Sequence, residues 1–207
     1  HSIAIGTWSG VSHALHDHHE PFALIWIDAY LDAHTFEDSH TKNIHGMPAA
    51  CLVGEGDEAL THILNPNPKI DPRHLFTLGF RSFHADELNR LQRLGAHCYS
   101  MNHIHEHSLE TILNDITQKL DHLGIKKIGI TLDVDALDPT IVPAVTVPEA
   151  NGLSLEQTNA IINHCLSNRD LLAFELVELA PNHDSDHKSL HAVQSIINTV
   201  QSNLTGP

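Results

Sequence analysis

Basic side chains are scarce in this chain of 207 residues. It has 11 Lys and Arg against 26 Asp and Glu, which gives a net charge of −15 with histidine neutral. Nucleic acids and anionic lipid surfaces are bound through basic patches, so the charge argues against both as partners. The charge would suit a cationic substrate, although solubility alone is the commoner reason for an acidic chain.

Cysteines and long apolar runs are also scarce. Cys51, Cys98 and Cys165 are odd in number and far apart, and no CxxC pair occurs, which argues against a zinc knuckle or a disulfide framework. This pattern predicts a cytoplasmic protein. No apolar run reaches transmembrane length and no signal peptide is visible, so no membrane association is expected. Because the chain opens at His1, we expect an N-terminal portion of the domain to be missing.

Histidine, by contrast, is abundant. The chain has 20 of them, many more than a metal site uses. Four of them form a group that we expect at the surface: His13, His16, His18 and His19. Hydrophobic residues make up 41% of the chain, enough for the core of one domain, which we expect to span residues 1–207.

Apolar runs alternate with amphipathic segments along the chain. Strands are predicted at residues 22–27, 75–79, 97–101, 127–132 and 171–177. Helices are predicted at residues 2–15, 47–52, 85–94, 108–123, 154–167 and 187–204. Strands that are apolar on both faces are typical of a parallel sheet between helices. The sequence therefore predicts an α/β fold of three layers, α-β-α, with a mostly parallel sheet.

Polar side chains fall on every second residue after the first predicted strand: Asp28, Tyr30, Asp32 and His34. If this segment stays extended, all four side chains project from one face. Hard cations favour several carboxylate oxygens that converge on one point, so the segment suggests half of a metal site. Tyr30 fits this interpretation badly because a neutral phenol is a poor ligand.

A second acidic pair, Asp133 and Asp135, directly follows the strand predicted at residues 127–132. Turn chemistry accounts for the later Asp138, but it does not account for two carboxylates at the end of a buried strand. Like charges so close together are costly unless a cation or a proton lies between them. Open parallel sheets bind ligands at the carboxyl ends of their strands, so a metal site is predicted there.

Taken together, the motifs of this chain resemble the ureohydrolases, the arginase and agmatinase family. The matching motifs are Asp28-Ala-x-x-Asp32, Asn43-Ile-His-Gly46, Asp133-Val-Asp-x-Leu-Asp-Pro139 and Val177-Glu-Leu-Ala-Pro181. Their order and spacing are closest to arginases, and the opening HSIAIG resembles the end of the family's GGDHSxAxG motif. The resemblance spans nearly the whole chain. It implies an arginase-like fold and hydrolysis of a guanidinium group to urea and an amine by a hydroxide that bridges two Mn²⁺ ions. It also implies a homo-oligomer, commonly a trimer or hexamer.

The resemblance further implies a set of metal ligands. His1, Asp28, Asp32 and Asp133 would bind one ion. Asp28, Asp133 and Asp135 would bind the other, together with position 30, where the family has a histidine and this chain has Tyr30. The second ion should therefore bind more weakly. The oxygen-rich ligands would also suit Fe²⁺ or Co²⁺.

Catalytic and substrate-binding roles follow from the same resemblance. His45 matches the acid/base or proton-shuttle histidine, although alone it would read equally well as a loop histidine. Glu178 matches the carboxylate that binds the guanidinium, for which two parallel hydrogen bonds are suited. Asp32 is counted with them as catalytic. His34 would contact the substrate carboxylate or cap its loop.

The residues expected around the rest of the substrate depart from the family pattern. Thr41 keeps a hydroxyl near the substrate carboxylate. Ser82 and His84, the latter a candidate substrate contact, stand where arginases have acids, one of which recognises the substrate amino group. Val147 replaces a threonine that supports the guanidinium. Guanidinium hydrolysis is thus a firmer expectation than arginine as the substrate.

Two alternatives remain at this point. One is an arginase-fold pseudoenzyme that binds one ion or none and acts as a binding or regulatory protein, which Tyr30 and Val147 favour. The other is a related metal-dependent deacetylase, which the Asn-Ile-His-Gly and DVDxLDP motifs disfavour. The presence of His45 and Glu178 favours the hydrolase, because a pure scaffold has no use for them.

Overall fold

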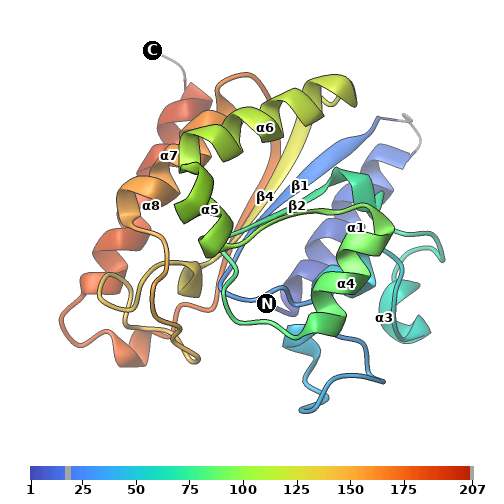
Figure 1. Ribbon diagram of the computed structural model, residues 1–207, viewed down its shortest axis with the longest axis horizontal. Coiled ribbons are helices and arrows are strands. Elements are labelled where there is room, and N and C mark those ends of the chain that lie inside the picture. Colours follow the sequence, from blue (N-terminus) through green and yellow to red (C-terminus); the bar gives the residue numbers. More distant parts are fainter. Residues whose placement is uncertain (17–19, 206–207) are drawn as a thin grey trace.

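A parallel sheet of five strands forms the centre of the computed structural model, which describes residues 1–16 and 20–205 (Figure 1). In spatial order the strands are β3 (His97–Tyr99), β2 (Leu75–Leu78), β1 (Phe22–Ile27), β4 (Lys127–Asp133) and β5 (Asp170–Val177). Every neighbouring pair is parallel. The first strand in sequence therefore lies in the middle, where it is apolar on both faces.

Helices cover both faces of this sheet. One face is covered by α1 (Ile3–His16), α2 (Pro48–Leu52) and α4 (Ala85–Leu94). The other is covered by α5 (Met101–His107), α6 (Leu109–His122), α7 (Leu155–Leu166) and α8 (Lys188–Thr205). The short α3 (Glu58–Thr61) follows α2. The predicted three-layer α/β fold is confirmed.

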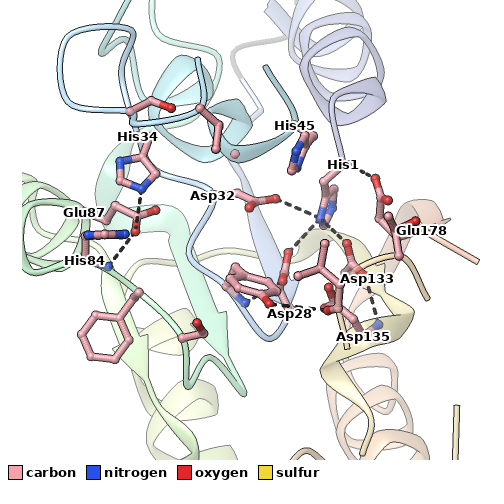
Figure 2. A pocket seen from close by; sticks show the side chains of 18 residues that line it. His1, Asp28, Asp32, His34, His45, His84, Glu87, Asp133, Asp135 and Glu178 are labelled. Carbon is pink, nitrogen blue, oxygen red and sulfur yellow. Dashed lines mark hydrogen bonds and ion pairs between the residues drawn. The ribbon is translucent and has the colours of Figure 1, made fainter. Parts of the chain in front are cut away.

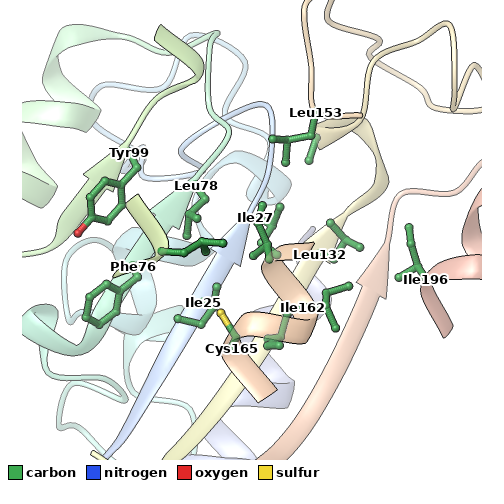
Figure 3. Close-up of a cluster of buried hydrophobic side chains, with 14 of the residues drawn as sticks. Ile25, Ile27, Phe76, Leu78, Tyr99, Leu132, Leu153, Ile162, Cys165 and Ile196 are labelled. Carbon is green, nitrogen blue, oxygen red and sulfur yellow. The ribbon is translucent and has the colours of Figure 1, made fainter. Parts of the chain in front are cut away.

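The position of strand β1 explains why its sequence contains no polar residue, because the strand is buried on both faces. Ile25 and Ile27 belong to the core on the face covered by α5 to α8, where Figure 3 shows Cys165 of α7 beside Ile25. Trp26, the residue between them, belongs to the core on the opposite face. Successive side chains of a strand face opposite sides, so a strand covered on both sides must be apolar throughout.

Glycine is required at one point of close packing between α1 and the sheet. A Cβ atom on Gly129 of β4 would lie 2.1 Å from the ring of Trp8, which is fully buried in α1. The missing side chain of Gly129 thus makes the space that this indole fills.

The sequence prediction was wrong at the end of the third strand. β3 ends at Tyr99, and Met101, predicted to be in the strand, begins α5 instead. Ser100 caps that helix, since its hydroxyl accepts from the backbone N–H of His103 at 3.1 Å. Helices α3 and α5 were not predicted.

The predicted surface group of histidines is only partly described. His13 is exposed, as expected, whereas His18, His19 and the side chain of His16 lie outside what the structure describes. None of the described helices combines the length and apolar character needed to cross a membrane.

The segment after β1 does not stay extended, so the condition under which residues 28, 30, 32 and 34 would share one face is not met. The strand ends at Ile27, and the backbone N–H of Tyr30 donates back to the Asp28 carboxylate at 2.7 Å. Asp32 has φ of 48°, in the left-handed region. The chain therefore turns away from the sheet after β1. The four side chains meet because this turning loop lines one cavity, and not because they alternate along a strand.

Candidate active site

A cavity of about 400 Å³ opens at the carboxyl ends of β1, β4 and β5 (Figure 2). Its lining includes every residue that the sequence nominated: His1, Asp28, Tyr30, Asp32, His34, Thr41, His45, His84, Asp133, Asp135 and Glu178. Further lining residues are Ser39, Gly46, Ser82, Phe83, Glu87, Thr146 and Val147. Groups far apart in the sequence thus meet at one place in the fold.

The floor of the cavity is acidic and buried. We call it the acidic floor: His1, Asp28, Asp32, Asp133 and Asp135, all less than a tenth exposed. Nδ1 of His1 lies 2.8 Å from Asp28, 3.3 Å from Asp133 and 3.4 Å from Asp32. Three carboxyl groups therefore converge around one imidazole.

Two overlapping groups within this floor have the spacing of metal sites. One contains His1, Asp28 and Asp32, and the other contains Asp28, Asp133 and Asp135. In each group the candidate ligand atoms lie within 4.8 Å of one another. Asp28 belongs to both groups, which is the arrangement needed for two ions that share a ligand.

The carboxyl groups of the acidic floor have raised pKa values, because they are buried close to one another. Burial, and then the charge of Asp28, raises the pKa of Asp133 to about 6 and that of Asp135 to about 11. The same two causes hold the pKa of Asp32 well above its ordinary value. Burial lowers the pKa of His1, but hydrogen bonds with Asp133 and Asp28 outweigh it and hold that pKa well above its usual value. These carboxyls ionise together only when positive charge is close, so the donor set fits divalent ions.

A buried hydrogen-bond chain orients His1. Its Nε2 lies 2.8 Å from the hydroxyl of Thr131, which donates to Glu175 at 2.7 Å. In the neutral ring Nε2 must therefore carry the hydrogen, which leaves Nδ1 facing the carboxylates. The ring also stacks on Trp26 at 4.2 Å. Sequence reasoning missed Thr131 and Glu175, although a polar residue within each buried strand was a usable signal.

Tyr30 lines the cavity, but its hydroxyl is turned to one wall. It lies 3.4 Å from the Glu149 carboxylate and 3.5 Å from the carbonyl oxygen of Val147. Burial and the nearby charges of Asp135 and Glu149 raise the pKa of this phenol above its usual value. The phenolate form, which would be the better ligand, is thus further disfavoured.

The two proposed catalytic side chains outside the acidic floor lie above it. Glu178 directly follows β5, has φ of 64°, and contacts the backbone nitrogen of His1. His45 belongs to a short 3₁₀ segment, Ile44–Gly46, and is exposed to the cavity. The carbonyl of Gly46 accepts from the backbone N–H of His34 at 3.0 Å, which ties this segment to the loop after β1.

His34, Glu87 and His84 form the opposite wall, which we call the histidine side. Figure 2 shows them together, across the cavity from Asp133, Asp135 and Glu178. Nδ1 of His34 lies 3.0 Å from Asp38, and its Nε2 lies 3.2 Å from Glu87. Of the two roles expected for His34, these contacts favour holding the loop in place.

Comparison with known proteins gives one consistent result. A model of the arginase family matches residues 1–201. An arginase from Bacillus caldovelox is 31% identical over 97% of this chain and 65% of that protein. An arginase from Coccidioides posadasii is 36% identical over 87% of this chain and 57% of that protein.

The structures agree as well. A solved arginase structure from Bacillus caldovelox superposes with a TM-score of 0.90 at 31% identity, over 98% of this chain and 66% of that one. The expected arginase-like fold is thereby confirmed. The chain spans less than two thirds of the length of the two related sequences.

Proposed function

The chain belongs to the arginase family, and on this basis we propose that it is a metal-dependent amidinohydrolase that releases urea from a guanidino substrate. The observation that carries the proposal is the pair of buried ligand groups that share Asp28, in one cavity with Glu178 and His45. We propose two ions per chain, with His1, Asp28, Asp32 and Asp133 around one, and Asp28, Asp133 and Asp135 around the other.

Two divalent ions held by these residues would supply Lewis-acid activation of water, which makes a nucleophile available near neutral pH. We propose Mn²⁺ from the family resemblance; Fe²⁺ and Co²⁺ suit the same oxygen-rich ligands. The homo-oligomer and the cytoplasmic location expected from the sequence stay predictions.

In this proposal, Glu178 binds the positively charged guanidinium group of the substrate. Its carboxylate lies at the edge of the acidic floor and is about one third exposed, so it is open to a ligand from the cavity. A carboxylate accepts two parallel hydrogen bonds from a guanidinium, which fixes the plane of that group over the floor. Held in this way, the guanidinium carbon faces the acidic floor, where the attacking water is activated.

In this proposal, His45 supplies a proton to the leaving nitrogen, and Asp32 positions the attacking water. Water adds to the guanidinium carbon, the bond from that carbon to the chain nitrogen breaks, and urea leaves. The departing nitrogen needs a proton, and His45 is placed at the solvent side of the cavity, where it can exchange protons with water. Asp32 lies next to His1 on the floor and holds the water in position for attack.

The proposal is tested with two variants and two readouts. Asp133→Asn removes a ligand of both ions, so bound metal and urea release should both fall, by more than the roughly 10- to 100-fold typical of losing an outer-shell partner. Glu178→Gln should abolish most urea release while bound metal stays unchanged. Metal is measured by elemental analysis after reconstitution, and urea by assay with several guanidino compounds.

The outcome that contradicts the proposal is equally clear. An intact chain that releases no urea from any guanidino compound and holds fewer than two ions would be a pseudoenzyme with a binding role. Exposed His105 on α5 does not line the cavity, and His105→Ala is the control that should leave both readouts unchanged.

A further inference from the structure

The histidine side of the cavity differs in chemistry from the acidic floor opposite. It presents the imidazole rings of His34 and His84, whose centroids are 5.1 Å apart, and His40 lies 5.4 Å beyond His84. A substrate whose guanidinium reaches Glu178 would place its other end here. The groups available on this side therefore decide what that other end can be.

The carboxylates on the histidine side are already engaged. Glu87 is 3% exposed, and it accepts from the backbone N–H of Ala33 at 3.1 Å and of His84 at 2.8 Å. Its second oxygen also lies 3.2 Å from Nε2 of His34. An ammonium group placed here would have to take Glu87 from these partners.

The neighbouring Asp38 is equally occupied. It accepts from the backbone N–H of Thr35 at 2.8 Å, contacts Nδ1 of His34, and forms an ion pair with Arg90. Asp86 is exposed but does not line the cavity. This wall therefore lacks, among the described residues, a carboxylate that is both open to the cavity and free to pair with an ammonium group.

Two hydroxyl groups that line the cavity, those of Ser39 and Thr41, are available to donate hydrogen bonds. The Ser39 hydroxyl accepts from the backbone N–H of Lys42 at 3.0 Å, and the Thr41 hydroxyl accepts from that of Asn43 at 3.2 Å. Each hydroxyl oxygen is thus used as an acceptor, and its hydrogen is left to donate. Donors stabilise an acceptor such as a carboxylate.

From this arrangement we infer that the substrate carries a carboxylate, and no amino group, at the end opposite its guanidinium. The inference rests on the proposed function, because it names the substrate class of the same site. An ammonium group here would lose its hydration and gain no partner, which costs more than an uncharged carbon at the same position. The substrate is a guanidino acid such as 5-guanidinopentanoate, which water converts to urea and 5-aminopentanoate.

The test uses three compounds that differ by one group each. Arginine carries both the amino and the carboxylate group, 5-guanidinopentanoate lacks the amino group, and agmatine lacks the carboxylate. We expect kcat/KM for 5-guanidinopentanoate to exceed that for arginine about tenfold or more, from the cost of an unpaired ammonium. Agmatine should be the poorest of the three.

A substitution on the histidine side should reverse this order. His84→Asp places a carboxylate at the cavity wall, so the ratio of arginine to 5-guanidinopentanoate turnover should rise about tenfold or more. His84 precedes α4 as its N-cap, and aspartate is favoured at that position, so the variant should fold. His105→Asp is the matched control, with the same charge change outside the cavity, and should leave the ratio unchanged.

The outcomes separate the inference from the proposed function. If arginine or agmatine is the best of the three substrates, or if His84→Asp leaves the ratio unchanged, the inference is wrong while hydrolysis stands. If none of the three compounds yields urea with two ions bound, the proposed function fails first.

Discussion

The acidic floor and the histidine side face each other across one cavity, yet they come from different parts of the fold. The floor carboxylates lie at or just beyond the ends of the central strands β1 and β4, and they are buried and crowded. The histidine side comes from the loop after β1 and the start of α4, and His84 there is exposed.

The two regions also shift the pKa values of their carboxyl groups in opposite directions. Asp135 on the floor has its pKa raised to about 11, because burial and neighbouring carboxylates disfavour its ionised form. The pKa of Asp38, behind the histidine side, is lowered to about 2, because hydrogen bonds from Arg90, Thr35 and His34 outweigh its partial burial. The floor carboxyls need a cation or protons to offset their mutual repulsion, whereas the carboxylates of the histidine side are satisfied by the protein itself. In the proposed function, this contrast separates the place of chemistry from the place of specificity.

The largest effect is expected at Tyr30, which lines the same cavity and departs from the family pattern. Tyr30→His would place an imidazole near Asp28 and Asp135, so the second ion should bind about tenfold more tightly or better. Titration of the metal-free protein with Mn²⁺, followed by calorimetry, measures this. Tyr30→Phe, which removes only the hydroxyl, is the control and should leave the affinity unchanged. Equal affinity in all three proteins would show that position 30 is not at the ion.

A smaller effect is expected in the pH dependence of the unfolding free energy of the metal-free protein. Carboxyls with raised pKa favour the folded state while protonated, so their contribution is complete below about pH 4, the ordinary pKa of aspartate. That contribution is lost as pH rises through the folded-state pKa of Asp133, about 6, and toward that of Asp135. Chelator-treated protein should therefore need less denaturant to unfold at pH 8 than at pH 5, and saturating Mn²⁺ should remove the difference. A midpoint that rises with pH in the metal-free protein would refute the contrast between the two regions.

The smallest effect is expected on the histidine side. Asp38→Asn removes the charge that pairs with Arg90 and weakens the bond to His34, which should destabilise the fold by about 1–2 kcal/mol. KM should rise with bound metal unchanged, since the floor does not depend on Asp38. Denaturant unfolding, elemental analysis and steady-state kinetics follow the three quantities. Loss of metal in this variant would show that the two regions are coupled.

The elements were largely predictable because their patterns are local. The apolar run of β1 and the amphipathic pattern of α6 identified a strand and a helix within about one residue of their observed bounds. The failure at Met101 has a local cause, because an apolar residue after a short strand continues the strand pattern equally well, and only the Ser100 cap marks the helix. The turn after Ile27 was missed since the Asp28 side chain, rather than a glycine or proline, makes it.

The layered fold and the acidic residues at the strand ends could be read from the sequence alone. Strand ends of a parallel sheet lie at one edge, so Asp28, Asp133 and Asp135 were expected at the same edge of the sheet. The pairing of β1 with β4, which the sequence did not predict, makes them neighbours. The hydrogen-bond partners of each polar group became visible only in the folded chain. Glu87 reads in the sequence as an ordinary helical acid, but in the fold it is buried and shared by Ala33, His84 and His34. Hydrogen-bond partners distant in sequence leave no local pattern, and they decide which groups on the histidine side remain open to a substrate.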